Sequence, residues 1–180
     1  MKAIKLMLFV AAAAMLFAAC GKDDAELADN TLVYGGVTYQ MDQSQAVVDY
    51  YHNELTLLTV PSVEKDGEEA KIIFDHFHLR PESWNKTIDL VNLKEDDFYE
   101  LAFSGSVLNM MAFGQKTVGE QYFSGLLDGQ IYENNPVFES GELTVKGNND
   151  GTPITVILDS KLKNGKELRM KIVSPSYKTN

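Results

Sequence analysis

The fold is decided by one stretch near the C-terminus, residues 141–172, which reads GELTVKGNNDGTPITVILDSKLKNGKELRMKI. Apolar and polar residues alternate before the polar break at 147–151, after it, and again beyond Asn164-Gly165. A period of two is typical of a β-strand with one buried face. Asn-Gly between two such segments predicts a type I′ hairpin turn, because both residues tolerate a positive φ. The stretch therefore predicts an antiparallel meander of three strands.

The alternation also predicts which side chains of the meander enter the core. In the segment 153–162, the side chains expected on the core face are Ile154, Val156 and Leu158. In the last strand, the expected core residues are Leu168, Met170 and Ile172. The residues expected to point to water there are Glu167, Arg169 and Lys171.

The rest of the chain repeats this pattern less regularly. Further strands are predicted at 31–34 and 37–41 (a hairpin around Gly35-Gly36), 46–51, 54–60, 71–79, 87–91, 107–113 and 121–127. A charged turn is expected at 65–69 and a helical turn within 92–101. About ten short strands at this spacing predict one all-β domain, an antiparallel β-sandwich with a C-terminal meander. The alternative is a calycin-like β-barrel.

The N-terminus has the features of a lipoprotein leader. Lys2 and Lys5 precede an apolar run over 6–18, and Phe17-Ala18-Ala19 leads into Cys20, the only cysteine. The run is too short to cross a bilayer, which needs about 20 apolar residues. We therefore expect a signal peptide over 1–19, lipidation (palmitate-type acyl chains) on Cys20, a flexible tether over 20–30 and the domain over 31–180. The alternative is an ordinary secreted protein, cleaved after an Ala-x-Ala site such as 12–14.

The mature chain resembles the small uncharacterised surface lipoproteins of Bacteroidetes. The likeness lies in Gly21-Lys22-Asp23-Asp24, which resembles their short acidic export tag, in the hairpin YGGVTY at 34–39, and in the segment ESGELTVK at 139–146 with the strand and Asn-Gly turn that follow. The resemblance implies an all-β module without a known reaction. It also implies a lipid-anchored position on the outer membrane, exposed at the cell surface through Lys22, Asp23 and Asp24. A periplasm-facing anchor is the alternative.

Charge restricts the partners. The chain carries 26 acidic and 16 basic residues, a formal net charge of −10. Nucleic-acid binding depends on Lys and Arg displacing counterions from phosphates, so nucleic acid is excluded as an expected partner. Anionic lipid headgroups are disfavoured for the same reason, which leaves the N-terminal lipid as the expected membrane contact.

Few residue patterns point to chemistry. His76 and His78, spaced by two in a predicted strand, would place both imidazoles on one face, together with Ile72 and Phe74. Zinc would need a further ligand such as His52, so we interpret the pair as histidines at a strand end and expect no metal. Ser62-Val63-Glu64-Lys65 matches the Ser-x-x-Lys pattern by chance, because its companion motifs are missing. No cofactor is expected.

Aromatic residues are the remaining candidates for a ligand surface. Trp84 lies in a polar loop at 80–86, and Tyr122 and Tyr132 lie in or near predicted strands. Rings on loops or outer faces bind sugars and peptides through flat apolar contact. We therefore expect a non-catalytic binding module for a glycan, peptide or partner protein, with an exposed platform around Trp84. The alternatives are an accessory subunit of an envelope complex and a metal-dependent enzyme using His76 and His78.

Overall fold

The structure, a computed structural model, describes residues 26–40, 47–51, 54–58, 62–65, 68–148 and 152–173. Its strands are β1 (Thr31–Tyr34), β2 (Val37–Gln40), β3 (Val47–Tyr51), β4 (Glu54–Leu58), β5 (Ser62–Lys65), β6 (Glu68–Lys71), β7 (Ile73–Leu79), β8 (Thr87–Asp89), β9 (Phe98–Ser104), β10 (Met110–Thr117), β11 (Glu120–Leu127), β12 (Gln130–Glu133), β13 (Phe138–Lys146), β14 (Thr155–Leu162) and β15 (Glu167–Val173). A short 3-10 helix, η2 (Pro81–Ser83), follows β7.

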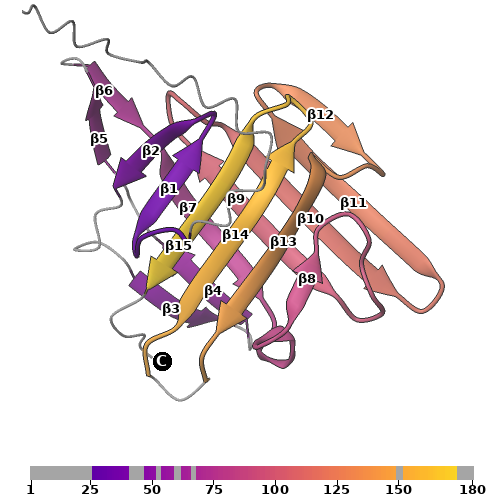
Figure 1. The fold of residues 1–180 in the computed structure, drawn as a ribbon. Helices are drawn as coiled ribbons and strands as arrows, with labels where there is room; N and C mark the ends of the chain where they lie inside the picture. The colour runs from indigo at the N-terminus through magenta and orange to yellow at the C-terminus, as the bar shows by residue number, and fades with distance from the viewer. Residues whose placement is uncertain are drawn as a thin grey trace, which may run out of the picture.

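The strands form two antiparallel sheets packed face to face (Figure 1). One has six strands in the order β2-β1-β15-β14-β13-β8, and the other has seven in the order β12-β11-β10-β9-β7-β4-β3. Strands of the first sheet run across those of the second, and β5 pairs with β6 as a separate hairpin. The predicted β-sandwich is confirmed. The alternative of a calycin-like barrel is wrong, since no ladder among the described strands joins the two sheets into one closed barrel.

The C-terminal meander is confirmed, with the predicted register. β13, β14 and β15 are neighbours in the six-stranded sheet, and β1 pairs with β15, so the first and last strands of the domain lie side by side. The side chains predicted for the core are buried, namely Ile154, Val156, Leu158, Leu168, Met170 and Ile172. Alternate residues of these strands therefore define an outer face, which includes Lys171.

The turn between β14 and β15 differs from the prediction. Only Gly165 has a positive φ, of 81°, whereas a type I′ turn needs two such residues. The Leu162 carbonyl accepts from the Gly165 N–H at 2.9 Å, and the Leu162 N–H donates to Lys166 at 2.8 Å. This is a three-residue loop, a turn followed by a left-handed glycine. The Asn164 side chain instead donates to the Asp128 carboxylate at 2.9 Å, which ties the loop to the turn after β11 in the other sheet.

The predicted strand 71–79 contains a β-bulge. Pairing with β9 shifts register between Phe74 and His76, which leaves one extra residue at Asp75. Ile72 and Phe74 before the bulge and Phe77 and Leu79 after it are all buried in the core. The prediction that Ile72 and Phe74 share a face with His78 is therefore wrong, because the inserted residue inverts the alternation. For His76 it stays a prediction, since that side chain lies outside the described residues.

Two other expectations are wrong. The helical turn expected within 92–101 is instead a tight turn at 94–97, with Asp96 at a positive φ of 69°, and β9 begins after it at Phe98. The alternation of this central strand is hidden because apolar residues occupy both of its faces. The charged turn at 65–69 is shorter than expected, since Glu68 and Glu69 belong to β6 and pair with Lys65 and Glu64 of β5. The strand β12 was not predicted at all.

Replacement of a core residue and of the turn glycine should both destabilise the meander. Ile172→Ala should cost about 2–5 kcal/mol of unfolding free energy through the cavity it leaves. Gly165→Val should cost about 1–2 kcal/mol, because a β-branched residue resists the left-handed backbone. Urea unfolding measures both changes. Glu167→Ala, at an exposed position of the same strand, is the control and should stay within about 0.5 kcal/mol of wild type; a loss equal to that of Ile172→Ala would contradict the register.

Candidate functional site

Three aromatic rings meet on the outer face of the seven-stranded sheet. Phe98 of β9 lies opposite Gln115 of β10, which lies opposite Tyr122 of β11. Phe113, two residues before Gln115, projects from the same face between the other two rings. Edge-on contacts join Phe98 to Phe113 at 5.5 Å and Phe113 to Tyr122 at 5.8 Å between ring centroids. We call Phe98, Phe113 and Tyr122 the aromatic row.

Exposure increases along the aromatic row. Phe98 is 7% exposed and Tyr122 is 51% exposed, with Phe113 intermediate. The Phe98 ring is covered by the Arg80 guanidinium, which lies 5.1 Å from the ring centroid in a cation–π arrangement. Arg80 is the residue between β7 and η2. One end of the row is therefore capped by a positive charge, and the other end is open to solvent.

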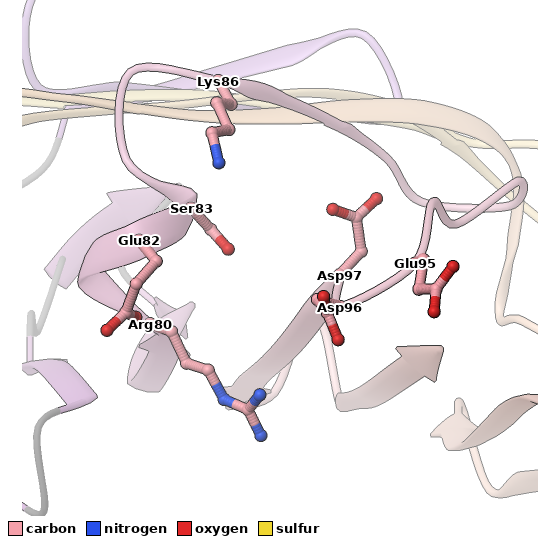
Figure 2. Close-up of a pocket in the computed structure, with 7 residues that line it drawn as sticks. All are labelled: Arg80, Glu82, Ser83, Lys86, Glu95, Asp96 and Asp97. Atoms are coloured by element: carbon pink, nitrogen blue, oxygen red, sulfur yellow. The ribbon is translucent and has the colours of Figure 1, made fainter. Parts of the chain in front are cut away.

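An open pocket of about 400 Å³ adjoins the capped end of the row. Its lining residues are Arg80, Glu82, Ser83, Lys86, Glu95, Asp96 and Asp97. Figure 2 shows that η2 and its flanks form one side, with the Lys86 ammonium and the Ser83 hydroxyl turned toward the open space, and that the three acidic residues at 95–97 form the other. Four carboxylates against two cations make the pocket acidic overall.

The η2 side of the pocket is fastened to the six-stranded sheet. The Ser83 N–H donates to the Arg80 carbonyl at 2.9 Å, which closes the single helical turn. Asn85 then donates its backbone N–H to the Val145 carbonyl at 2.7 Å. Its side chain bonds Gly147 twice, donating to the carbonyl at 2.8 Å and accepting from the N–H at 3.1 Å. The loop that carries Lys86 is thus held by the end of β13.

The acidic side of the pocket is a tight turn joined to β10. The Asp97 carboxylate accepts from the Lys94 N–H at 2.8 Å, and the Asp97 N–H donates to the Lys94 carbonyl at 3.0 Å. Backbone bonds at 3.1 and 2.9 Å connect Asp96 and Asp97 to Lys116 of β10. These bonds hold the carboxylates of Glu95 and Asp96 outward at the pocket rim.

Asp89 fixes the chain between β8 and the acidic turn. Burial alone would raise the pKa of its carboxyl, but N–H donors of Asn92 and Val91, each at 2.9 Å, outweigh burial and lower the pKa below 3.8. Beside it, Tyr99 donates its hydroxyl to the Leu90 carbonyl at 2.9 Å, and burial raises the pKa of that hydroxyl far above its usual range. Tyr99 therefore stays a neutral donor that anchors this segment.

The residues predicted to bind a ligand do not form one surface. Trp84 is 5% exposed and belongs to the core, so the expected exposed platform around it is wrong. A polar loop suggested exposure, but the turn of η2 folds the indole inward. Tyr132 packs against the core from β12, whereas Tyr122 lies on the outer face. Of the three, Tyr122 alone belongs to the candidate site.

Of the histidine pair, His78 contacts a carboxylate. His78 Nδ1 lies 3.3 Å from the Glu100 carboxylate of the neighbouring strand β9, at a half-buried position. The side chain of His76, and all of His52, lie outside the described residues. Within the described part of the chain, no three His, Cys, Asp or Glu side chains are placed to hold a metal ion.

Cys20, Lys22, Asp23 and Asp24 also lie outside the described residues. Where the structure is described, it contains no helix both long enough and apolar enough to span a bilayer. Comparison of the chain with protein-family models, with curated proteins and with solved structures found no match.

Acid should remove the contribution of Asp89 to stability. Because its pKa is lowered by folding, the ionised carboxylate stabilises the fold above the ordinary pKa of 3.8, and this contribution is lost as pH falls through the lowered value. We expect Asp89→Asn to melt below wild type at pH 7 and the gap to be narrower at an acid pH below 3.8. Thermal unfolding at the two pH values measures it. A gap that persists undiminished at the acid pH would contradict the assigned role.

Proposed function

We propose that this protein is a lipoprotein anchored to the outer membrane through Cys20 and exposed at the cell surface, whose β-sandwich is a non-catalytic module that binds a neutral glycan. The anchor is supported by the basic start, the short apolar run and the small residues before the single cysteine. Surface exposure is supported by the acidic tag Lys22-Asp23-Asp24. Binding is supported by one observation, the aromatic row with its half-exposed ring of Tyr122 and an acidic pocket at its other end.

The chemistry of the site favours a sugar. An exposed ring offers a flat apolar face with a polar edge, and the C–H faces of a pyranose stack on such a surface. The pocket at the Arg80 end of the row supplies carboxylates, an ammonium and a hydroxyl, which are partners for the hydroxyls of a glycan long enough to extend along the row from Tyr122. Its volume lies within the usual range of small-molecule sites. The excess of carboxylates disfavours sulfated or carboxylated sugars, so the proposed ligand is neutral.

A second candidate function, an accessory subunit of an envelope complex, is favoured by a different set of residues. Met111, Leu126 and Ile131 lie opposite one another on β10, β11 and β12, and Ile131 is 71% exposed on the edge strand. Exposed apolar side chains on a sheet edge are typical of protein contacts. The apolar strip shares no residue with the aromatic row, but it adjoins the row at β10, where Met111 and Phe113 are successive residues of the outer face. A substitution at Ile131, on the edge strand, therefore distinguishes the two functions best.

Loss of the exposed ring should weaken glycan binding. We expect Tyr122→Ala to reduce affinity for the glycan selected on an array by about tenfold or more, and Tyr122→Phe to retain it, because stacking needs the ring and not the hydroxyl. Calorimetry on the detergent-solubilised protein measures the change. Ile131→Ser is the matched control on the same sheet and should bind as wild type. Unchanged glycan binding in Tyr122→Ala would contradict the proposed site, whatever the result for Ile131→Ser.

Removal of the cysteine should release the protein from the membrane. Each buried methylene of an acyl chain contributes about 0.8 kcal/mol to membrane binding, and Cys20→Ser has no thiol to acylate. Membrane fractionation with a metabolic lipid label should find the variant unlabelled and outside the membrane fraction. Continued lipid incorporation by the Ser variant would disprove the anchor. Protease shaving of intact wild-type cells separates surface exposure from the periplasm-facing alternative.

A further inference from the structure

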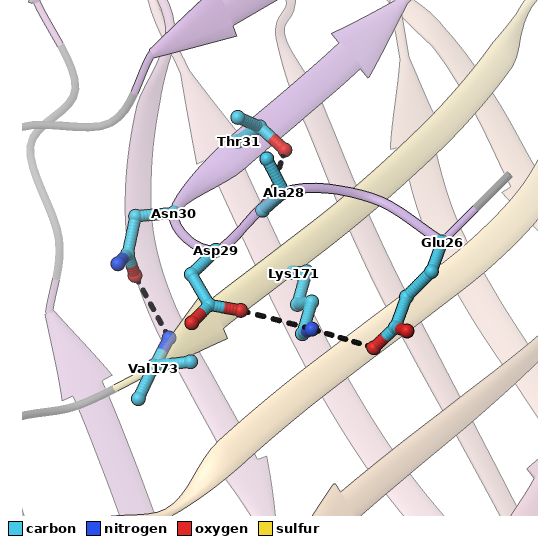
Figure 3. Close-up of polar contacts among 7 residues, drawn as sticks. All are labelled: Glu26, Ala28, Asp29, Asn30, Thr31, Lys171 and Val173. Atoms are coloured by element: carbon cyan, nitrogen blue, oxygen red, sulfur yellow. Dashed lines mark hydrogen bonds and ion pairs between the residues drawn. The ribbon is translucent and has the colours of Figure 1, made fainter.

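The segment that precedes β1 is held against the six-stranded sheet. Residues 26–30 cross over β15 on its outer face (Figure 3). The Lys171 ammonium lies 2.8 Å from the Glu26 carboxylate and 2.9 Å from the Asp29 carboxylate. The Lys171 side chain is only 16% exposed, although its position in β15 faces away from the core. The expectation that Lys171 simply points to water is therefore wrong, because this segment covers it. We call the contact of Lys171 with Glu26 and Asp29 the clasp.

Further hydrogen bonds fix the segment beside the clasp. The Val173 N–H donates to the Asn30 side chain at 2.8 Å, and the Asn30 carbonyl accepts from the Gln40 side chain at 3.0 Å. The Thr31 hydroxyl donates to the Ala28 carbonyl at 2.6 Å. Contacts thus come from β15, from β2 and from the segment itself, so the part of the expected tether at 26–30 has defined partners on the domain.

The contacts of the clasp favour the charged forms of Lys171 and Glu26. Hydrogen bonds to Asp29 and Glu26 raise the pKa of Lys171, and the bond from Lys171 lowers the pKa of Glu26. Each group is therefore stabilised in its charged form, and the clasp persists at neutral pH.

The clasp shortens the chain between the lipid and the domain. Six residue steps separate Cys20 from Glu26, and at about 3.6 Å per residue they reach at most about 20 Å. Without the clasp, the free chain would extend over eleven steps to Thr31, about 40 Å by the same measure. The clasp therefore halves the maximal distance between the acyl chains and the domain, and it fixes the face from which the chain leaves.

That face is suited to a hydrated headgroup layer. It carries two further ion pairs, with Lys161 at 2.9 Å from Glu139 and Arg169 at 3.5 Å from Asp159. The opposite outer face of the sandwich carries the aromatic row and the apolar strip. We propose that the clasp orients the anchored domain, so that the outer face of the six-stranded sheet lies toward the lipid surface and the aromatic row points away from it. This inference rests on the proposed lipidation of Cys20.

Energy transfer to labelled lipids tests the orientation. Since Cys20 is consumed by the lipid and is the only cysteine, one introduced cysteine gives a unique dye site on the full-length lipoprotein in phosphatidylcholine vesicles. Glu142→Cys places the dye on the six-stranded outer face, and Glu133→Cys places it on the seven-stranded outer face. We expect stronger transfer from position 142 than from position 133. Lys171→Met should abolish the difference, and the control Lys161→Met, which breaks an ion pair on the same face, should preserve it.

The outcomes separate the clasp from the anchor. Equal transfer from the two positions in the clasped protein, or a difference that survives Lys171→Met, would overturn the orientation. Failure of the wild-type protein to associate with vesicles would instead overturn the anchor and, with it, the orientation at a lipid surface. Hydrogen exchange of the Val173 amide checks the clasp without any lipid: we expect lost protection in Lys171→Met and retained protection in Lys161→Met.

Discussion

The structure depends on the burial of two sheet faces against each other. The only cysteine belongs to the proposed anchor, so no disulfide can assist, and the sandwich is held by non-covalent contacts, chiefly side-chain packing. Each fully buried large apolar side chain contributes about 1.5–3 kcal/mol, and both inner faces are lined with such residues, among them Tyr99, Phe103, Val156 and Met170. Because strand residues alternate, the inner faces also determine which residues form the two outer faces. The positions of the aromatic row and of the clasp both follow from that alternation.

Strands that alternate strictly between apolar and polar residues could be predicted from the sequence, whereas β9, which is covered on both faces, and the short edge strand β12 could not. β14 and β15 alternate strictly, so their core residues and pairing were predictable. The alternation did not predict β9, because Phe98 on its outer face is buried under Arg80. This places an apolar residue where a strand with one solvent-exposed face would have a polar one. The bulge at Asp75 could not be predicted for another reason. The extra residue is defined by how β7 pairs with β9, and no local sequence pattern indicates it. The Asn164 turn type likewise depends on a distant acceptor, Asp128.

The candidate site was harder to predict than the fold. Tyr122 could be selected as an aromatic residue near a strand, but its partners lie on β9 and β10, and only the register brings the three rings together. Arg80 gives no sequence signal for its place over Phe98. For Trp84 the sequence predicted an exposed ring that is in fact buried. Polar neighbours in the sequence do not prevent a short helical turn from directing a large ring into the core. Sites assembled by tertiary contact between strands are therefore read from the structure and not from a motif.

The two outer faces of the sandwich differ in the chemistry they present. The six-stranded face carries paired charges and receives the chain from the proposed anchor, whereas the seven-stranded face carries the aromatic row, with its exposed ring of Tyr122, and an adjoining acidic pocket. A core about one sheet spacing thick, roughly 10 Å, separates them, and no described hydrogen bond links the clasp to the aromatic row. Sites without shared partners contribute nearly additively to stability and binding. The proposed attachment to the membrane and the proposed recognition of a ligand can therefore be altered separately in this fold. A rigid sandwich held on a short chain would also keep the proposed binding face directed outward, which a freely rotating domain on a long tether would do only part of the time.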